Sequence, residues 1–208
     1  MAYETDEQQV EALKAWWAEN GRSIMLGAGL GLAVILGWQG YQRYEVSQAA
    51  EASDLYGEVA ASTDASVQSG HFETLKADYS STPYAGLAGL QLAKAQVLAE
   101  DFSAAETTLA WVAANAAEND VQAIATLRRA RVLVELKRYD DALAALPEVP
   151  APGFGSLQSS VRGDILLAQG NRSEARLAFQ QALSAGGPVA DQQLLQMKID
   201  DLAEGSEG

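Results

Sequence analysis

An uncharged stretch near the start of the chain limits what this sequence can fold into. Between Arg22 and Arg43, the 20 residues from Ser23 to Gln42 include no Asp, Glu, Lys, Arg or His. A helix of that length spans about 30 Å, the thickness of the hydrocarbon core of a bilayer. We therefore expect residues 23–42 to form a transmembrane helix in the lipid bilayer, with the chain before it and the chain after it on opposite sides.

Two other interpretations of this stretch fit the sequence less well. A buried helix of a soluble protein is disfavoured because the remaining chain is too polar to surround so apolar a helix. A cleaved signal peptide has a short basic leader, and a cleavage site with small residues follows its apolar run. Here the 22 leading residues carry five acidic side chains, and the run ends in Trp38-Gln-Gly-Tyr41. The sequence therefore predicts an anchor that is not cleaved.

Aromatic residues at both ends of the stretch support a membrane span. Trp16 and Trp17 precede it, and Trp38, Tyr41 and Tyr44 lie at its far end. Tyr and Trp collect at the lipid headgroups because each has an apolar body and a polar tip. These positions are those expected for the two interfaces of a single span.

The distribution of Lys and Arg predicts the orientation of the span. Lys14 and Arg22 precede it, whereas Arg43 is the only basic residue after it until Lys76. Loops rich in Lys and Arg stay in the cytoplasm, and acidic residues contribute little to this rule. We expect the N-terminus in the cytoplasm and the residues after Arg43 on the outer side of the membrane.

Glycines within the span indicate a possible contact with another membrane helix. Gly27 and Gly31 form a G-x-x-x-G pair, which allows two helices to approach closely in lipid. A nucleotide-binding glycine loop is excluded, because no strand precedes these glycines and they lie inside an apolar segment. We expect Gly27 and Gly31 to face the membrane helix of a partner.

The composition of the chain after the span restricts its partners and its fold. Residues 45–208 carry 11 Lys and Arg against 23 Asp and Glu, a net formal charge of −12. Nucleic acids and anionic lipid surfaces attract basic proteins, so this domain is not expected to bind nucleic acid. The absence of Cys excludes disulfides and thiolate zinc sites. An abundance of Ala and Leu favours helices over strands.

A repeat of small and large residues runs through this domain. Three small residues, 37 and 33 positions apart, each begin one unit of the repeat. In every unit an alanine follows twelve residues after the small residue, and a large apolar residue follows four residues after that alanine. The three units are Ala93-Ala105-Leu109, Ala130-Ala142-Leu146 and Gly163-Ala175-Phe179. The pattern resembles the tetratricopeptide repeat, a pair of helices about 34 residues long, although most of its consensus Trp and Tyr are missing. Small residues allow the two helices to cross closely, and large ones fill the space between neighbouring pairs. The alternative is a generic Ala- and Leu-rich helical bundle.

The segments around these units complete the expected domain. Residues 49–61 and 71–79 are predicted to be helices of a degenerate leading repeat. A loop rich in Pro and Gly, residues 147–155, separates the second and third units, and residues 189–202 form a capping helix. Residues 204–208 are predicted to be a disordered tail. The expected fold is all-α: a single N-terminal transmembrane helix followed by a tetratricopeptide-like solenoid of helix hairpins.

Residue types that carry out catalysis are scarce. His71 is the only histidine, and it has neither Cys nor a second His to pair with. Motifs of serine hydrolases, P-loop enzymes, zinc proteases and EF-hands do not occur. Neighbouring acidic residues fall at predicted turns and helix ends, where solvation or capping is their usual role. The sequence therefore predicts a protein that is not an enzyme and that binds no cofactor or metal.

The repeat alignment predicts a groove that binds a partner. In solenoids of paired helices the first helix of each pair lines the concave face. The residues that directly follow the aligned small residues are Lys94, Arg131 and Asp164. The residues one turn earlier are Leu90, Leu127 and Ser160. Such a groove would have an apolar floor and mixed charge, which suits an extended or helical protein segment.

Ordered sequence motifs from about residue 9 to residue 203 resemble one protein family. They include Gln9-Val-Glu-Ala-Leu-Lys14, Trp16-Trp17-Ala-Glu-Asn-Gly21, Gly37-Trp38, Tyr84-Ala-Gly-Leu-Ala-Gly-Leu-Gln-Leu-Ala93, Leu127-Arg-Arg-Ala-Arg-Val132, Arg162-Gly-Asp164, Gly170, Ala175-Arg176 and Leu195-Gln-Met-Lys-Ile199. The chain resembles the YfgM-like family of ancillary subunits of the Sec translocon of Gram-negative bacteria. The match is weakest over residues 45–80.

This resemblance implies a location and a set of partners. It implies a bacterial inner-membrane protein with a short cytoplasmic tail (residues 1–22), a transmembrane helix (23–42) and a periplasmic repeat domain (43–203). It also implies association with the SecYEG translocon and with periplasmic chaperones, notably a membrane-anchored prolyl-isomerase-like chaperone. Such a protein assists the passage or folding of translocated proteins. The alternative is a repeat scaffold of an unrelated envelope assembly or signalling complex.

Overall fold

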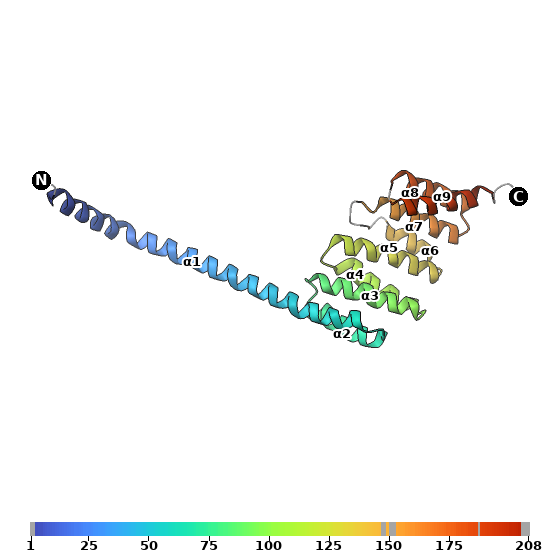
Figure 1. Cartoon of the computed structure of the whole chain (residues 1–208), viewed down its shortest axis with the longest axis horizontal. Coiled ribbons are helices and arrows are strands. Elements are labelled where there is room, and N and C mark those ends of the chain that lie inside the picture. Colours follow the sequence, from blue (N-terminus) through green and yellow to red (C-terminus); the bar gives the residue numbers. More distant parts are fainter. Residues whose placement is uncertain (1–2, 147–148, 150–152, 187, 205–208) are drawn as a thin grey trace. The chain divides into compact units, whose positions relative to one another are not determined.

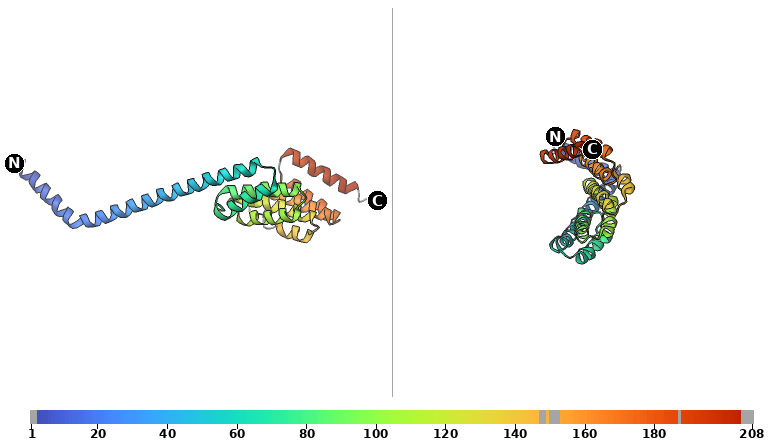
Figure 2. Two further views of the ribbon diagram at one scale, coloured as in Figure 1. Left: turned by 90° about the horizontal axis from the view of Figure 1, so that it is seen from below. Right: turned by 90° about the vertical axis from the view of Figure 1, so that its right-hand side faces the viewer.

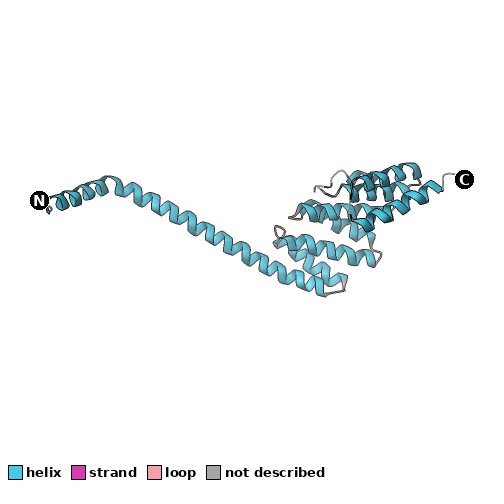
Figure 3. Cartoon of the chain, turned by 45° about the horizontal axis from the view of Figure 1, so that its top comes forward, coloured by secondary structure: helices cyan, strands magenta, loops and turns pink. Residues whose placement is uncertain are grey.

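All regular secondary structure in the described part of the protein is helical. The computed structural model describes residues 3–146, 149, 153–186 and 188–204, and these contain nine α-helices and no strand (Figure 3). The chain divides into two compact units, Met1–Gln48 and Ala49–Gly208 (Figure 1). The all-α fold that the composition predicts is confirmed.

The first unit is formed by the N-terminal part of helix α1 (Tyr3–Ala61). The apolar side chains of the predicted span are exposed throughout, with Met25 at 67 % and Val34 at 71 %. None of the apolar part of this helix is buried, and it is long and apolar enough to cross a membrane. This exposure contradicts the alternative of a buried core helix, whereas a helix surrounded by lipid would have its apolar side chains covered.

The second unit is a curved stack of antiparallel helices, as the right-hand view of Figure 2 shows. The end of α1 packs against α2, α3 pairs with α4, α5 with α6, and α7 with α8, while α9 packs on α8. The helices are α2 (Ala65–Asp78), α3 (Pro83–Leu98), α4 (Phe102–Asn115), α5 (Asn119–Glu135), α6 (Tyr139–Ala145), α7 (Gly155–Ala168), α8 (Arg172–Ser184) and α9 (Val189–Glu204). The predicted hairpin repeat with a closing helix is therefore confirmed.

The turns of three hairpins share one backbone geometry. Glu100, Lys137 and Gly170 each have a left-handed conformation, with φ of 59°, 60° and 87°. In each turn the next backbone N–H donates to a carbonyl five residues earlier, at 2.8 to 2.9 Å. This arrangement satisfies the free carbonyls at the helix end and is usually built with glycine. Only the third hairpin has glycine there, so the first two maintain the turn with residues that disfavour it.

The aligned small residues lie where the helices cross. Ala93 and Ala130 are 2 % and 0 % exposed, and Ala142, in the second helix of its pair, is 0 % exposed. One close crossing involves Gly163 on α7, where a Cβ atom would lie 2.6 Å from Cδ1 of Phe179 on α8. Real Cβ atoms do not approach carbon atoms that closely. Gly163 is therefore required for the Phe179 ring to fill this crossing.

The leading pair differs from its prediction in both helices: the helix predicted over residues 49–61 is the end of the continuous α1, and the second helix begins earlier than predicted. A helix was expected over residues 71–79, but α2 begins at Ala65 and ends at Asp78. The Asp64 carboxylate caps α2 by accepting hydrogen bonds from the backbone N–H and the hydroxyl of Ser66, and these bonds hold the pKa of Asp64 below its usual value. Gln68 is buried, and its amide donates to the carbonyls of Val59 and Ser62. Polar residues fill the first turns of α2, so the apolar periodicity there is weak.

Two other expectations fall on residues that the structure does not describe. The predicted Pro- and Gly-rich loop lies partly at 147–148 and 150–152, and nearly all of the predicted disordered tail at 205–208; these lie outside the described residues. Within the described part of the loop, Gly153 has a φ of 95°, the left-handed conformation that glycine readily adopts.

The Gly163–Phe179 crossing gives a direct test of the fold. Gly163→Ala introduces a Cβ atom into the Phe179 ring, and we expect it to lower the free energy of unfolding by about 1–3 kcal/mol, as overpacking of a core does. The matched control is Gly70→Ala in α2, where a Cβ atom meets nothing within 4 Å. This control should raise stability by about 0.5–1 kcal/mol, the gain from replacing a mid-helix glycine. Denaturant unfolding of the full chain, followed by circular dichroism, measures both. Equal effects of the two changes would show that Phe179 does not need the glycine.

Candidate partner-binding surface

The structure separates the six predicted groove residues into two groups. Leu127 is 1 % exposed and lies in a core with Ala130, and Leu90 is 9 % exposed and packs in a core with Ala93. The sequence analysis expects these leucines to form the apolar floor of a groove; the structure buries both in the core, and their part in binding stays a prediction. Residues three apart share one side of a helix, so these two leucines are buried together with Ala93 and Ala130. The other four, Lys94, Arg131, Ser160 and Asp164, line two open pockets.

One pocket, of about 310 Å³, lies between α3 and α5 and is called the basic pocket below. The residues that line it are Ala93, Lys94, Val97, Leu98, Leu109, Arg128, Arg131 and Val132. Buried side chains such as Leu109 and Val132 form its floor, while Val97 and Leu98 are 37 % and 77 % exposed at its edge. The pocket is therefore an apolar surface surrounded by cationic side chains.

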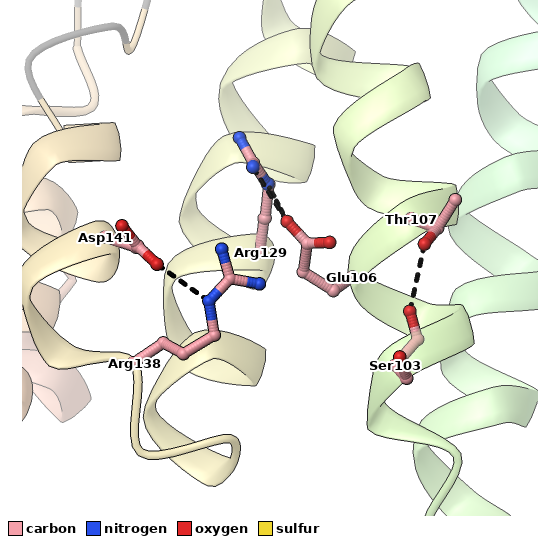
Figure 4. Close-up of polar contacts among 6 residues, drawn as sticks. All are labelled: Ser103, Glu106, Thr107, Arg129, Arg138 and Asp141. Atoms are coloured by element: carbon pink, nitrogen blue, oxygen red, sulfur yellow. Dashed lines mark hydrogen bonds and ion pairs between the residues drawn. The ribbon is translucent and has the colours of Figure 1, made fainter.

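The cations of the basic pocket differ from a neighbouring arginine on the same helix. Arg129 of α5 turns towards α4, where its guanidinium is 2.7 Å from Oε1 of Glu106 (Figure 4). In the described part of the chain, Lys94, Arg128 and Arg131 have no such ion pair, and no carboxylate lines the pocket. The run Leu127-Arg-Arg-Ala-Arg-Val132 thus provides one compensated arginine and two uncompensated ones.

A second pocket, of about 470 Å³, lies between α7 and α9 and is called the C-terminal pocket. The predicted residues Ser160 and Asp164 line it, and Arg131 lines both pockets. The Asp164 carboxylate forms an ion pair with Lys198 of α9, and the Lys198 ammonium also lies 4.9 Å from the centre of the Phe179 ring. Two of the charged side chains of this pocket are thus paired with each other, in contrast to the cations of the basic pocket.

Several surface residues were missed by the sequence analysis. The repeat alignment selected positions relative to the small residues, so it found Lys94 and Arg131 but not Arg128 or Leu98. It also treated the last helix only as a cap, although Lys198 of that helix lines the C-terminal pocket. Arg128 had one sequence signal: it belongs to a cluster of three arginines within four residues.

The glycines of the predicted span have open space around them. A Cβ atom at Gly27 or at Gly31 would meet nothing within 4 Å. The two residues are four apart, so they share one face of α1. This geometry leaves the face accessible to another membrane helix; that such a helix binds there stays a prediction.

The described residues show no arrangement suited to catalysis. Nδ1 of His71 lies 3.2 Å from Oε2 of Glu58 on the surface, where both side chains remain accessible. Across the described part of the chain, no group of three or more His, Cys, Asp or Glu residues is placed to hold a metal ion. Some other polar contacts join residues three or four apart in the sequence, such as Arg138 with Asp141 and Thr107 with Ser103 (Figure 4). The features that stand out are surfaces for recognition.

Comparison with known proteins covers both the anchor and the hairpins. The family described as "Tetratricopeptide repeat-like domain" matches residues 14–204. The curated relatives named "Ancillary SecYEG translocon subunit" include one from Haemophilus influenzae, 33 % identical over 97 % of this chain and 100 % of the relative. The relative from Escherichia coli is 31 % identical over 97 % and 98 %, and that from Neisseria gonorrhoeae is 30 % identical over 97 % and 99 %.

This chain belongs to the family of ancillary SecYEG translocon subunits. The resemblance drawn from the sequence motifs is thereby confirmed, and so is the tetratricopeptide-like character of the hairpins. The apolar helix and the family together indicate a single-pass protein of the inner membrane. No solved structure matches this member of the family.

Proposed function

We propose that this chain is a membrane-anchored, non-enzymatic subunit that associates with the SecYEG translocon and assists the passage or folding of translocated proteins. The observation that carries the proposal is the coverage of the family match. The relatives named as ancillary translocon subunits align over 98–100 % of their own length, so anchor and repeat domain share the order found in the family. A match to the repeats alone would support only a general interaction module.

The two units have separate roles in this proposal. Residues 1–22 form a short cytoplasmic tail, and residues 23–42 span the membrane, where Gly27 and Gly31 pack against a membrane helix of the translocon. Residues 43–203 form the periplasmic repeat domain, which engages periplasmic chaperones such as a membrane-anchored prolyl-isomerase-like protein. The open pockets on α3, α5 and α7, and the family name, support this division.

Association with SecYEG is tested by purification from native membranes. The full chain, tagged after Gly208, is extracted in a mild detergent, and SecYEG is quantified in the eluate. We expect SecYEG to copurify, and Gly27→Leu with Gly31→Leu to reduce its yield several-fold by keeping the helices apart. The control is Gly29→Leu with Gly37→Leu, which adds the same volume on other faces of the span and should leave the yield unchanged.

Two outcomes would contradict parts of the proposal. If SecYEG is absent from the wild-type eluate while a different envelope complex is enriched, the chain is a scaffold of that assembly instead. If both pairs of leucine substitutions leave the yield of SecYEG unchanged, the Gly27–Gly31 face is not the contact.

The orientation of the chain is a second testable expectation. Lys14 and Arg22 before the span are expected to retain the N-terminus in the cytoplasm. A reporter enzyme that is active only in the periplasm, fused after Gly208, should therefore be active. A reporter that is active only in the cytoplasm should be inactive at the same position. The reverse pair of activities would contradict the proposed topology.

A further inference from the structure

We infer that the basic pocket between α3 and α5 binds an acidic amphipathic protein segment, whose apolar side chains enter the pocket and whose carboxylates pair with its cations. This inference deepens the proposed function and rests on one part of it: that the partner of the repeat domain is a protein. It specifies the chemistry of the segment, which neither the fold nor the family name assigns.

The first observation is the apolar surface of the pocket. Leu98 is 77 % exposed, the largest exposure of any large apolar side chain in the described residues. Val97 lies beside it, and both adjoin a floor of core side chains that includes Leu109. An exposed leucine at the edge of an apolar depression contributes nothing to the core, but it can bury its surface against a partner.

The second observation is the uncompensated positive charge. The domain has a net charge of −12, and Lys76, Arg129, Arg138 and Lys198 each form an ion pair with a nearby carboxylate. Of the seven Lys and Arg residues without such a pair in the described part of the domain, three gather around one apolar pocket: Lys94, Arg128 and Arg131. Like charges repel one another, so this cluster is not explained by the stability of the domain.

The charge and apolar character together select one kind of occupant. Nucleic acids and anionic membranes are repelled by the rest of the acidic domain. A basic or neutral segment would leave the three cations without partners. An amphipathic segment with Leu or Phe on one side and Asp or Glu beside them satisfies both surfaces. Helix-in-groove recognition places such apolar anchors at i, i+3, i+4 and i+7.

The neighbouring C-terminal pocket does not share this selectivity. Asp164 and Lys198 neutralise each other there, and the exposed carboxylate of Asp191 also lines it. A segment that extends from one pocket to the other would pass Arg131, which lines both. The acidic end of the segment is therefore expected at the basic pocket.

Binding of two designed peptides tests this inference. Both are fluorescein-labelled 14-residue peptides with Leu at i, i+3, i+4 and i+7; one has Glu at the remaining positions and the other has Lys. Fluorescence anisotropy measures their binding to the full chain in nanodiscs of zwitterionic phosphatidylcholine. We expect the Glu peptide to bind at least tenfold more tightly than the Lys peptide, and its affinity to fall as salt rises.

Variants locate the binding site and separate it from the overall charge. Lys94→Glu with Arg131→Glu should weaken the Glu peptide at least tenfold, and Leu98→Gln should weaken it several-fold. The matched control is Arg162→Glu with Arg176→Glu, which changes the net charge equally at two exposed arginines outside the pocket and should have little effect. The melting temperature of each variant shows that the domain is folded.

The possible outcomes distinguish this inference from the proposed function. Equal binding of the two peptides, no binding of the Glu peptide, or an equal loss in the control variant overturns the inference. So does self-association of the wild-type chain that Lys94→Glu with Arg131→Glu abolishes, because a second copy then covers the pocket. If the Glu peptide binds selectively but SecYEG does not copurify, the inference holds and the proposed function fails.

Discussion

The close crossing of paired helices at small residues is the constraint on which the repeat domain depends. Gly163 lies directly against the Phe179 ring, and Gly89 of α3 lies similarly against Val112 of α4 and Phe72 of α2. Without a side chain at the crossing, the two backbones approach closely enough for one large residue to fill the space between neighbouring elements. Each such contact fixes the rotation of a helix about its own axis.

That rotation determines which side chains reach solvent. Because Ala130 faces its partner helix, Leu127, three positions earlier, is buried with it. The next residue is turned by about 100° and reaches the open surface, as Lys94 and Arg131 do. The crossing residues thus place two cations on adjacent first helices, and Arg128 and Leu98 complete the pocket between them. The proposed binding surface is thus a consequence of the packing that holds the hairpins together.

Much of this arrangement could be predicted from the sequence because it depends on local spacing. The uncharged stretch indicated the span, and the recurrence of Ala105 and Ala142 after small residues indicated the hairpins. The left-handed turns at Glu100 and Lys137 could not be predicted, since neither residue favours that conformation and the surrounding hairpin imposes it. The start of α2 was missed because a buried glutamine, Gln68, interrupts its apolar pattern. The ion pair between α7 and α9 joins residues distant in sequence, which no spacing rule connects.

In the proposed arrangement, the repeat domain contacts translocated or translocon-associated proteins through the face formed by α3 and α5. A photo-crosslinking amino acid is placed at Leu98 in one variant and at Leu177 in another. Both positions are exposed, at 77 % and 59 %, but only Leu98 lines the basic pocket. The variants are crosslinked in intact cells that translocate protein, and the proteins crosslinked at each position are identified and quantified. We expect adducts with SecYEG, with a periplasmic chaperone or with translocated proteins at Leu98, and few at Leu177. Adducts confined to Leu177, or equal at both positions, would contradict the proposed arrangement.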